Sequence, residues 1–429
     1  MAESTTFMFK DEHNQEQGID RKNLVAVVQN ADGATSIIIH IEPTEGHDAE
    51  PPKVKIIKAQ ADPAYPRLDI TSGRETHIIV STGSGTGKAD TFFKQAVKPV
   101  LENLFPASHN SFQIHHTTSE SSILDLTSNT FFPKANSGSL IRIILLSGDG
   151  GVIDLVNGLL SKPASKEYAP PQVILLPLGT ANALYHSINA GTDNTWGLRF
   201  LAEDAKSHSL PIFTAVFSPG AYLLVDEARR EEELPKDPES GRKILHGAVV
   251  GSWGMHASLV ADSDTAEYRK FGIERFKMAA NDALYPADGS PPHAYKAKVS
   301  VLKGDSWKQL PELEHMYVLA TMTSNLEKLF TISPASKPLD GSLHLVRFGP
   351  TNGNEAMRLM GLAYQGGKHV EDPAVLYEAI DGLRIEFEGR EENARWRRIC
   401  IDGKIIRVEE DGWVELKKEP RHVLDVAGN

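Results

Sequence analysis

The chain has 429 residues, so at about 150 residues per domain we expect two or three domains. Its 45 basic and 57 acidic side chains give a net charge of −12, which argues against a nucleic-acid-binding protein because phosphate backbones bind to basic patches. The single cysteine, Cys400, excludes an internal disulfide and a zinc site built on several thiolates. The polar first residues lack the apolar core of a secretory signal, and no run approaches the roughly 18 apolar residues of a membrane span, so we expect a cytoplasmic protein.

Residues 1–75 are expected to form an N-terminal extension. Residues 1–20 are polar and predict no regular structure. Between residue 24 and about residue 58, two apolar runs flank an Asp32-Gly33 turn and a third run follows. This pattern predicts a hairpin with one further strand, which together would make a small β cap.

Residues 76–215 alternate between strand and helix patterns. Apolar runs such as HIIV, IRIILL and QVILL are each followed by a glycine-containing loop and then by helical spacing of apolar residues. Pro99 lies in the first helical stretch and predicts a kink or an interruption there. The repeated order of strand, loop and helix predicts a three-layer α/β/α domain with a mostly parallel sheet. Ligands of such sheets bind where loops leave the carboxyl ends of the strands.

Residues 216–429 are predicted to form an antiparallel β-sandwich domain. Apolar and polar residues alternate over 295–301 and 383–388, and Asp-Gly pairs recur between such runs as they do in turns. One or two helices are expected, around 263–280 and 353–364. The stretch 226–243 is strongly charged and has no apolar periodicity, so we expect a solvent-exposed insertion.

Three glycine-rich loops each follow an apolar strand of the α/β region. They read STGSGTGK from Ser81, SGDGG from Ser147 and PLGTANA from Pro177. Each loop alone could be a turn or a helix cap, because Asp, Thr and Asn cap helices well and glycine is common in turns. Three such loops at one sheet edge instead indicate a nucleotide or polyphosphate site, since glycine lets backbone N–H groups approach phosphates closely.

Asp149 is the acidic residue of the second loop, and glycines flank it on both sides. Two interpretations are open for this carboxylate: a helix cap, or a general base or organiser of phosphate and metal. The first loop is not a Walker A loop, because Thr82 occupies the position of its first glycine and Ala89 follows Lys88.

The ordered set of motifs resembles the diacylglycerol kinase catalytic domain superfamily and, within it, the sphingosine kinase branch. The resemblance rests on the three loops, including SGDGGVIDLVNGL from Ser147 and PLGTANAL from Pro177. It continues in WGMHASLVADSDTAEYRKFGIERF from Trp253, PLDGSLHLVRFG from Pro338 and CIDGK from Cys400. It covers most of the chain from about residue 76 onward.

The resemblance implies transfer of the γ-phosphoryl group of ATP to a lipid hydroxyl, with Mg²⁺ as a cofactor. Asp149 would be the catalytic base; Ser147, Asp149 and Asp262 would meet the substrate, Asp262 at the polar head of a sphingoid base. The residues implied in nucleotide binding are Ser81, Thr82, Gly83, Gly85, Gly87, Lys88, Thr117, Gly148, Gly150, Asp154, Gly179, Thr180, Ala181, Asn182, Arg269, Arg275, Asp402 and Gly403. The sequence does not indicate which residues would hold the metal.

Several residues depart from the family's pattern. Ala181 stands where the family usually has glycine, Lys404 and Asp154 each stand where it has glutamate, and Gly151 replaces a threonine or leucine. These departures bear on the strength of nucleotide binding. The alternatives are a kinase for diacylglycerol, ceramide or another lipid, and a catalytically silent regulator that binds nucleotide or lipid.

The resemblance also implies partners and a location. A lipid kinase of this kind would be a cytoplasmic protein that makes transient peripheral contact with a membrane and does not bind nucleic acid. The oligomeric state is left open by the sequence.

Overall fold

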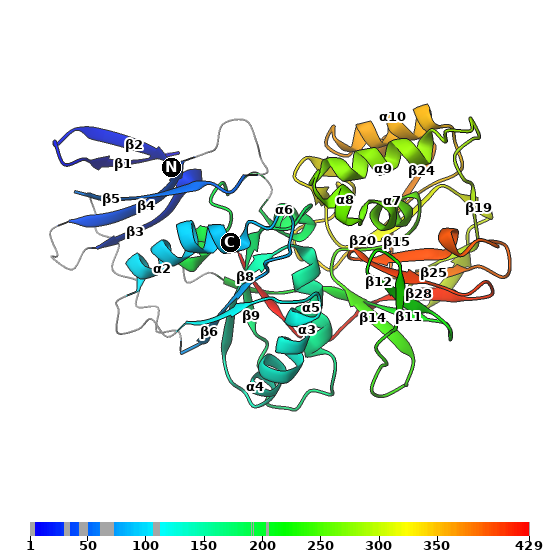
Figure 1. Cartoon of the computed structure of the whole chain (residues 1–429), viewed down its shortest axis with the longest axis horizontal. Coiled ribbons are helices and arrows are strands. Elements are labelled where there is room, and N and C mark those ends of the chain that lie inside the picture. The colour runs from blue at the N-terminus through cyan, green and yellow to red at the C-terminus, as the bar shows by residue number, and fades with distance from the viewer. Residues whose placement is uncertain are drawn as a thin grey trace.

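The computed structural model describes residues 5–29, 35–42, 50–60, 73–105, 112–189, 191, 193–202 and 206–428. Figure 1 shows an N-terminal group of strands at one end, a mixed α/β region in the middle and a β-rich region at the other end. This order confirms the expected fold class at the level of an α/β region followed by a β-rich one.

The middle region is built on a six-stranded sheet with the order β10-β29-β9-β8-β6-β7. Neighbouring strands from β29 to β7 pair in parallel, and β10 pairs antiparallel to β29 at the edge. In chain order the strands are β6 (Glu75–Val80), β7 (Gln113–His116), β8 (Ile141–Ser147), β9 (Gln172–Pro177), β10 (Lys206–Ser209) and β29 (Asp425–Gly428).

Both faces of this sheet are buried around its central strands, which explains why β6, β8 and β9 are largely apolar runs. Ile78 and Ile144 belong to a hydrophobic cluster shared with the first helices, whereas Ile79 and Ile143 belong to a second cluster that includes Leu155. The helices of the region are α1 (Ala89–Phe92), α2 (Lys98–Leu104), α3 (Ser122–Leu126), α4 (Phe132–Asn136), α5 (Asp149–Leu159) and α6 (Ala183–Ile188).

The first helical stretch is interrupted, as Pro99 predicts. A π-helical turn, Phe93–Val97, separates α1 from α2, and Pro99 is the second residue of α2, directly after this turn. Because proline has no N–H, it cannot donate a regular helical hydrogen bond there.

The β-rich region contains two antiparallel sheets. The six-stranded sheet has the order β14-β11-β28-β25-β17-β18 and the eight-stranded sheet the order β13-β12-β27-β26-β15-β20-β23-β24. Their strands are β11 (Ile212–Phe217), β12 (Tyr222–Val225), β13 (Arg230–Glu233), β14 (Lys243–Gly247), β15 (Val250–Gly254), β17 (Lys298–Lys303), β18 (Ser306–Gln309), β20 (Tyr317–Thr321), β23 (Leu343–Phe348), β24 (Val375–Ile380), β25 (Gly382–Glu386), β26 (Arg398–Ile401), β27 (Lys404–Arg407) and β28 (Trp413–Glu419).

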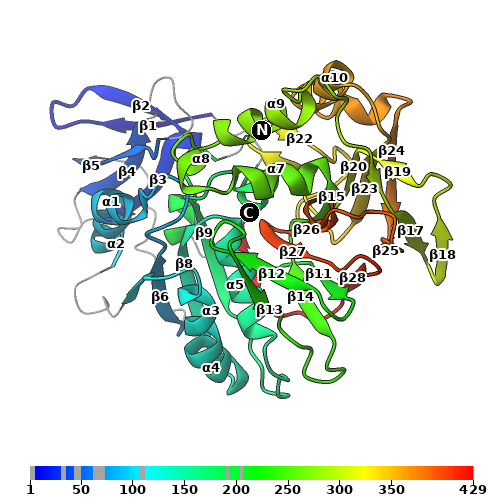
Figure 2. The ribbon, with the colours of Figure 1, turned by 45° about the vertical axis from the view of Figure 1, so that its right-hand side comes forward.

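Four helices lie beside one another at the outer side of the β-rich region (Figures 1 and 2). They are α7 (Met255–Ser263), α8 (Ala266–Arg269), α9 (Glu274–Leu284) and α10 (Gly353–Ala363). The helix expected over 353–364 is confirmed, but the one expected around 263–280 is divided, because α7 ends at Ser263 and α9 begins at Glu274.

The N-terminal extension is more regular than its polar sequence predicts. The three expected strands are β3 (Leu24–Gln29), β4 (Ser36–Glu42) and β5 (Lys53–Ala59), while the Asp32-Gly33 turn lies outside the described residues. The expectation that residues 1–20 have no regular structure is wrong: β1 (Thr6–Lys10) and β2 (Glu16–Asp20) form a hairpin. Phe7 and Phe9 project from one face of β1 and are buried. These two alternating aromatic residues give the hairpin its apolar face.

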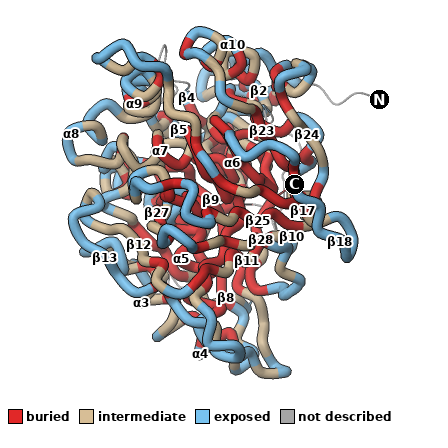
Figure 3. Tube along the Cα trace, turned by 90° about the vertical axis from the view of Figure 1, so that its right-hand side faces the viewer, coloured by how far each residue is buried: buried red, intermediate tan, exposed pale blue. Residues whose placement is uncertain are grey.

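The charged stretch 226–243 is exposed but is not simply a loop. It contributes β13, which pairs with β12 at the edge of the eight-stranded sheet, and all four residues of β13 are exposed (Figure 3). Arg407 donates to Glu231 at 2.6 Å, and Lys243 lies 2.9 Å from Glu233. Such charges are typical of an edge strand that avoids pairing with other chains.

The last strand, β29, does not belong to the β-rich region that the sequence places at residues 216–429. β29 returns from the β-rich region and pairs in parallel with β9 of the α/β sheet. Its four residues, DVAG, are too short a pattern to place it from sequence.

Candidate active site

The three glycine-rich loops lie in direct contact. A Cβ atom on Gly148 would lie 2.7 Å from the Cα atom of Gly179, and a Cβ on Gly179 would lie 2.4 Å from the Cα of Gly148. A Cβ on Gly85 would lie 2.5 Å from the carbonyl oxygen of Leu178. Ser84 Oγ also accepts a hydrogen bond from the Gly148 N–H at 3.2 Å. Only glycine allows these backbones to approach so closely.

Asp149 begins α5, yet its carboxylate caps a different helix. One oxygen accepts the N–H of Ala183 at 2.8 Å and the other accepts the N–H of Leu184 at 3.0 Å, both from the first turn of α6. Burial raises the pKa of Asp149, and the hydrogen bonds from Leu184 and Ala183 oppose this rise. The capping interpretation and the catalytic one are thus compatible, because these contacts fix the carboxylate in one orientation.

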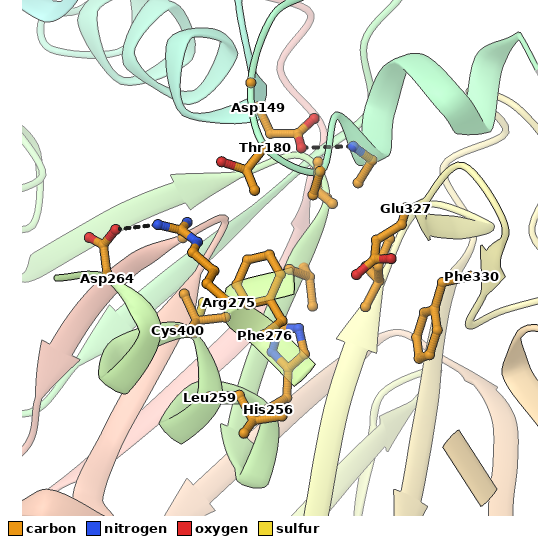
Figure 4. A pocket seen from close by; sticks show the side chains of 18 of the residues that line it. Asp149, Thr180, His256, Leu259, Asp264, Arg275, Phe276, Glu327, Phe330 and Cys400 are labelled. Carbon is orange, nitrogen blue, oxygen red and sulfur yellow. Dashed lines mark hydrogen bonds and ion pairs between the residues drawn. The ribbon is translucent and has the colours of Figure 1, made fainter. Parts of the chain in front are cut away.

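One cavity of about 550 Å³ begins at this carboxylate and extends into the β-rich region (Figure 4). The glycine loops and the turn at Asp402 line its polar end. The other end lies among α7, α9 and α10, where Leu259, Phe276, Phe330 and Met360 line it. The cavity therefore joins a phosphate-sized polar site to an apolar chamber.

About half of the predicted site residues line this cavity. They are Gly85, the stretch 148–150, the stretch 179–182, Arg275, Asp402 and Gly403. The predicted residues that do not line it are Ser81, Thr82, Gly83, Gly87, Lys88, Thr117, Ser147, Asp154, Asp262 and Arg269.

The residues of the first loop outside the cavity wall have partners of their own. Thr82 and Thr117 are paired by two hydrogen bonds, from the Thr82 N–H to Thr117 Oγ1 at 3.0 Å and from Thr82 Oγ1 to the Thr117 carbonyl at 2.9 Å. Lys88 pairs with Glu50 of the N-terminal extension.

The structure does not bring Asp262 to the cavity. Its two carboxylate oxygens accept from Arg395 at 2.8 Å and from Arg398 at 2.7 Å, so they are already satisfied. Asp264, two residues further on, lines the cavity instead. Sequence reasoning missed Asp264 although it belongs to the same ADSD segment.

Asp264 forms ion pairs with both predicted arginines, Arg269 and Arg275. Arg269 donates to it at 2.9 and 3.0 Å and Arg275 at 3.1 Å. Burial alone would raise the pKa of Asp264, but the two guanidinium groups outweigh burial and the pKa is lowered. Arg275 lines the cavity and is drawn paired with Asp264 in Figure 4, whereas Arg269 does not line it. The three side chains form one charged cluster.

Lys404 and Asp154, two of the departures from the family's pattern, contact each other. Lys404 Nζ lies 2.8 Å from Asp154 Oδ1, and only 9% of the Asp154 side chain is exposed. Burial raises the pKa of Asp154 and the lysine opposes that rise. This ion pair joins α5 to β27.

Asp402 occupies the turn between β26 and β27 with a φ of 46°. Its buried carboxylate accepts the N–H groups of Ala248, Val249 and Val250 at 2.6, 3.1 and 2.5 Å. Burial raises its pKa to about 7, although these hydrogen bonds act in the opposite direction. Asp402 therefore fixes the strand that follows β14 against the cavity.

Glu327 is a further carboxylate on the cavity wall that no sequence pattern indicates. It ends β21 (Asn325–Glu327) and accepts a hydrogen bond from the Tyr364 hydroxyl at 3.0 Å. Burial raises its pKa. Within the described ranges, no group of three or more His, Cys, Asp or Glu side chains is arranged to hold a metal ion.

Glycine loops in contact, a fixed carboxylate and an apolar chamber are together typical of an enzyme that joins a phosphate donor to a lipid. Residues 75–210 match the model of the diacylglycerol kinase catalytic domain. The chain is 23% identical over 379 residues to sphingosine kinase 1 of Rattus norvegicus, covering 82% of this chain and 90% of that protein. It is 24% identical over 343 residues to sphingosine kinase 1 of Homo sapiens, covering 72% and 81%.

Among solved structures, a diacylglycerol kinase from Bacillus anthracis str. Sterne has the same fold, with a TM-score of 0.51 and 17% identity over 84% of this chain and 98% of that one. Residues 75–210 thus resemble a diacylglycerol kinase catalytic domain. The protein is a lipid kinase that resembles the sphingosine kinase branch of the superfamily.

Proposed function

We propose that this lipid kinase transfers the γ-phosphoryl group of ATP to the primary hydroxyl of a sphingoid long-chain base. The observation that carries the proposal is the single cavity that runs from Asp149 and the glycine loops into an apolar chamber. A volume of about 550 Å³ lies within the range of ligand sites that enclose small organic molecules.

The polar end of the cavity fits a nucleotide. The close approach of Gly148 and Gly179 leaves backbone rather than side chains on this wall, and α5 directs its positive end toward it. Arg275 and Lys404 add positive charge. Magnesium, when bound with the nucleotide, would neutralise developing phosphate charge; with few protein ligands, it would be held mainly through phosphates and water.

Asp149 is proposed as the base of the reaction. The lipid hydroxyl oxygen forms a bond to the γ-phosphorus, the bond from that phosphorus to the leaving oxygen of ADP breaks, and the hydroxyl proton passes to Asp149. A carboxylate with a raised pKa is better matched to this task than an ordinary one. The hydrogen bonds from α6 would hold the carboxylate in one orientation, and each carboxylate oxygen has a further lone pair for the hydroxyl.

The head group of the lipid is assigned to the cluster around Asp264. A sphingoid base carries an amine that diacylglycerol and ceramide lack, and Asp264 is a carboxylate on the cavity wall. Because Asp264 also holds Arg269 and Arg275, phosphate oxygens that attract these arginines would release the carboxylate for the amine. This coupling would favour binding of base and nucleotide together.

Peripheral membrane contact is proposed for the side on which the apolar chamber lies. Large apolar side chains are exposed on and beside α8, α9 and α10, namely Phe271, Met278, Tyr285, Leu329, Met357 and Tyr364. Met357 and Tyr364 also line the cavity, so a lipid could pass from a membrane surface into the chamber. In the described part of the chain, no helix is both long enough and apolar enough to cross a bilayer.

We also propose that the sheets are layered as the sequence predicts. The α/β/α arrangement would span residues 76–215, the two antiparallel sheets of 216–429 would form a sandwich, and residues 1–75 would be an accessory β cap. The separate hydrophobic clusters on the two faces of the parallel sheet support the layering of the α/β region.

A lipid panel tests the proposed function directly. Purified protein, radiolabelled ATP and magnesium are incubated with sphinganine, diacylglycerol or ceramide. The proposal predicts a labelled product with sphinganine and little with the neutral lipids. Labelling of diacylglycerol alone would contradict the sphingoid assignment, and ATP binding without transfer to any lipid would support a silent regulator.

A further inference from the structure

The apolar chamber contains one imidazole among its aliphatic and aromatic side chains. His256 lies in the first turn of α7 and lines the cavity beside Met255, Leu259 and Cys400. Its ring packs edge-to-face on Tyr317, with centroids 6.0 Å apart. Figure 4 shows the ring on the chamber side of α7, with Phe276 above it. A polar group in this wall is costly unless something pairs with it.

One nitrogen of the ring has a partner within the protein. His256 Nδ1 lies 2.7 Å from Ser252 Oγ, and Ser252 faces Cys400 across the β15–β26 pair. Either atom of this contact can be the donor, depending on the tautomer of the ring. In both tautomers Nε2 is the ring nitrogen left for a ligand, and a hydroxyl group can pair with it as acceptor or donor.

The ring is neutral at physiological pH. Burial lowers the pKa of His256 to about 4, and the positive end of α7 also disfavours the charged form. The chamber wall therefore carries a neutral ring nitrogen, Nε2, and not a cation. Such a group does not attract phosphate or repel an amine, but it pairs well with a hydroxyl group.

The position of His256 along the cavity follows from the strand register. Cys400 lies two residues before Asp402, which occupies the turn after β26, and Ser252 is paired with Cys400. Asp402 lies at the polar end of the cavity. The imidazole thus lies where the apolar chamber meets the polar end.

We propose that His256, positioned by Ser252, is a subsite for a hydroxyl group on the chain of the lipid, close to its head. The ligand class is a long-chain base with one hydroxyl more than sphinganine. This inference rests on the proposed function, because it assumes that the chain of the lipid lies in the chamber. A lipid without this hydroxyl would bury Nε2 unpaired, so discrimination is expected.

The test compares sphinganine with phytosphingosine, which carries one more hydroxyl near its head. The wild-type enzyme should have a kcat/KM about tenfold higher for phytosphingosine. In His256→Phe, which keeps an aromatic ring without a donor, the ratio should fall to about one. His256→Gln, which keeps a donor, should retain part of the preference. Leu259→Ala, a neighbouring apolar change, should alter both substrates alike.

A second readout does not require turnover. A pyrene-labelled fatty alcohol is bound in the cavity, and its displacement by each lipid is measured for the wild type and His256→Phe, with melting temperatures to establish that both are folded. Stronger displacement by phytosphingosine in the wild type alone would support the subsite even if neither lipid is phosphorylated. Equal displacement, or a preference that persists in His256→Phe, would overturn it.

Discussion

Asp149 illustrates how one side chain can meet a structural and a chemical need. Its carboxylate accepts two N–H groups of α6, and this contact holds the loops after β8 and β9 together. The same contact removes the rotational freedom of the carboxylate, which a positioned base requires. Burial then raises its pKa, so proton acceptance becomes easier without another residue.

Asp262 and Asp264 are neighbouring carboxylates with different surroundings, so substituting each of them separately tests which one contacts the substrate. Asp264→Asn should lower kcat/KM for sphinganine by roughly tenfold or more, because the variant weakens both the proposed amine contact and the placement of Arg275. Asp262→Asn should leave kcat/KM within about threefold. It should instead lower stability by about 2 kcal/mol, because Arg398 would lose its carboxylate partner in a mostly buried setting.

Steady-state kinetics and urea unfolding measure the two effects separately. If Asp262→Asn impaired turnover as strongly as Asp264→Asn at equal stability, the assignment of the head group to Asp264 would be wrong.

At the scale of elements, the site depends on how closely the loops pack. Gly179→Ala should abolish most activity and lower stability by about 1–3 kcal/mol, because the new Cβ would lie 2.4 Å from backbone that cannot move aside. Gly150→Ala is the matched control: no atom lies within 4 Å of its added Cβ. Thermal unfolding should therefore be nearly unchanged in Gly150→Ala.

Activity measurements on the same two variants complete this comparison. Gly179→Ala with wild-type stability and wild-type activity would show that the loops are not packed as described. A loss of ATP binding in Gly150→Ala at normal stability would indicate that the nucleotide itself needs this space.

The elements themselves could be predicted where the pattern is continuous. β8 and β9 are apolar throughout because both faces are buried, so the strands and their loops could be located from sequence. The β1–β2 hairpin could not, since its apolar contact consists of a few alternating residues in a polar segment. The edge strand β13 has no buried residue at all, and hence no hydrophobic pattern.

The sequence predicts the segment that carries the acidic residue of the site, but it does not predict which of two nearby aspartates faces the cavity, because the end of the helix is not known. Residues two apart on a helix differ in direction by about 200°, so Asp262 and Asp264 are not expected to face the cavity together. Which of them faces it depends on where α7 ends, at Ser263, and that end is not evident from the sequence. The pairing of Lys404 with Asp154 joins opposite parts of the chain, a contact that no local pattern reveals.

At the scale of the whole molecule, the cavity exists because two regions are held together around it. Lys404 of β27 pairs with Asp154 of α5. Asn157 of the same helix exchanges two hydrogen bonds of 3.0 Å with the backbone of His246 in β14. The chain also returns from the β-rich region to the parallel sheet, where β29 pairs with β9 and so connects the two regions. These contacts place phosphate loops and lipid chamber at a fixed separation.

The proposed reaction requires Asp149 to accept a proton at the junction of these two regions. The variant Asp149→Asn tests this role most directly. Lipid phosphorylation and ATP binding are measured on this variant and on Asp125→Asn, an exposed carboxylate of α3 outside the cavity. We expect transfer by Asp149→Asn to fall roughly 100- to 10,000-fold, ATP affinity to change by less than about threefold, and Asp125→Asn to behave as the wild type. Phosphoryl transfer at the wild-type rate by Asp149→Asn would contradict the account.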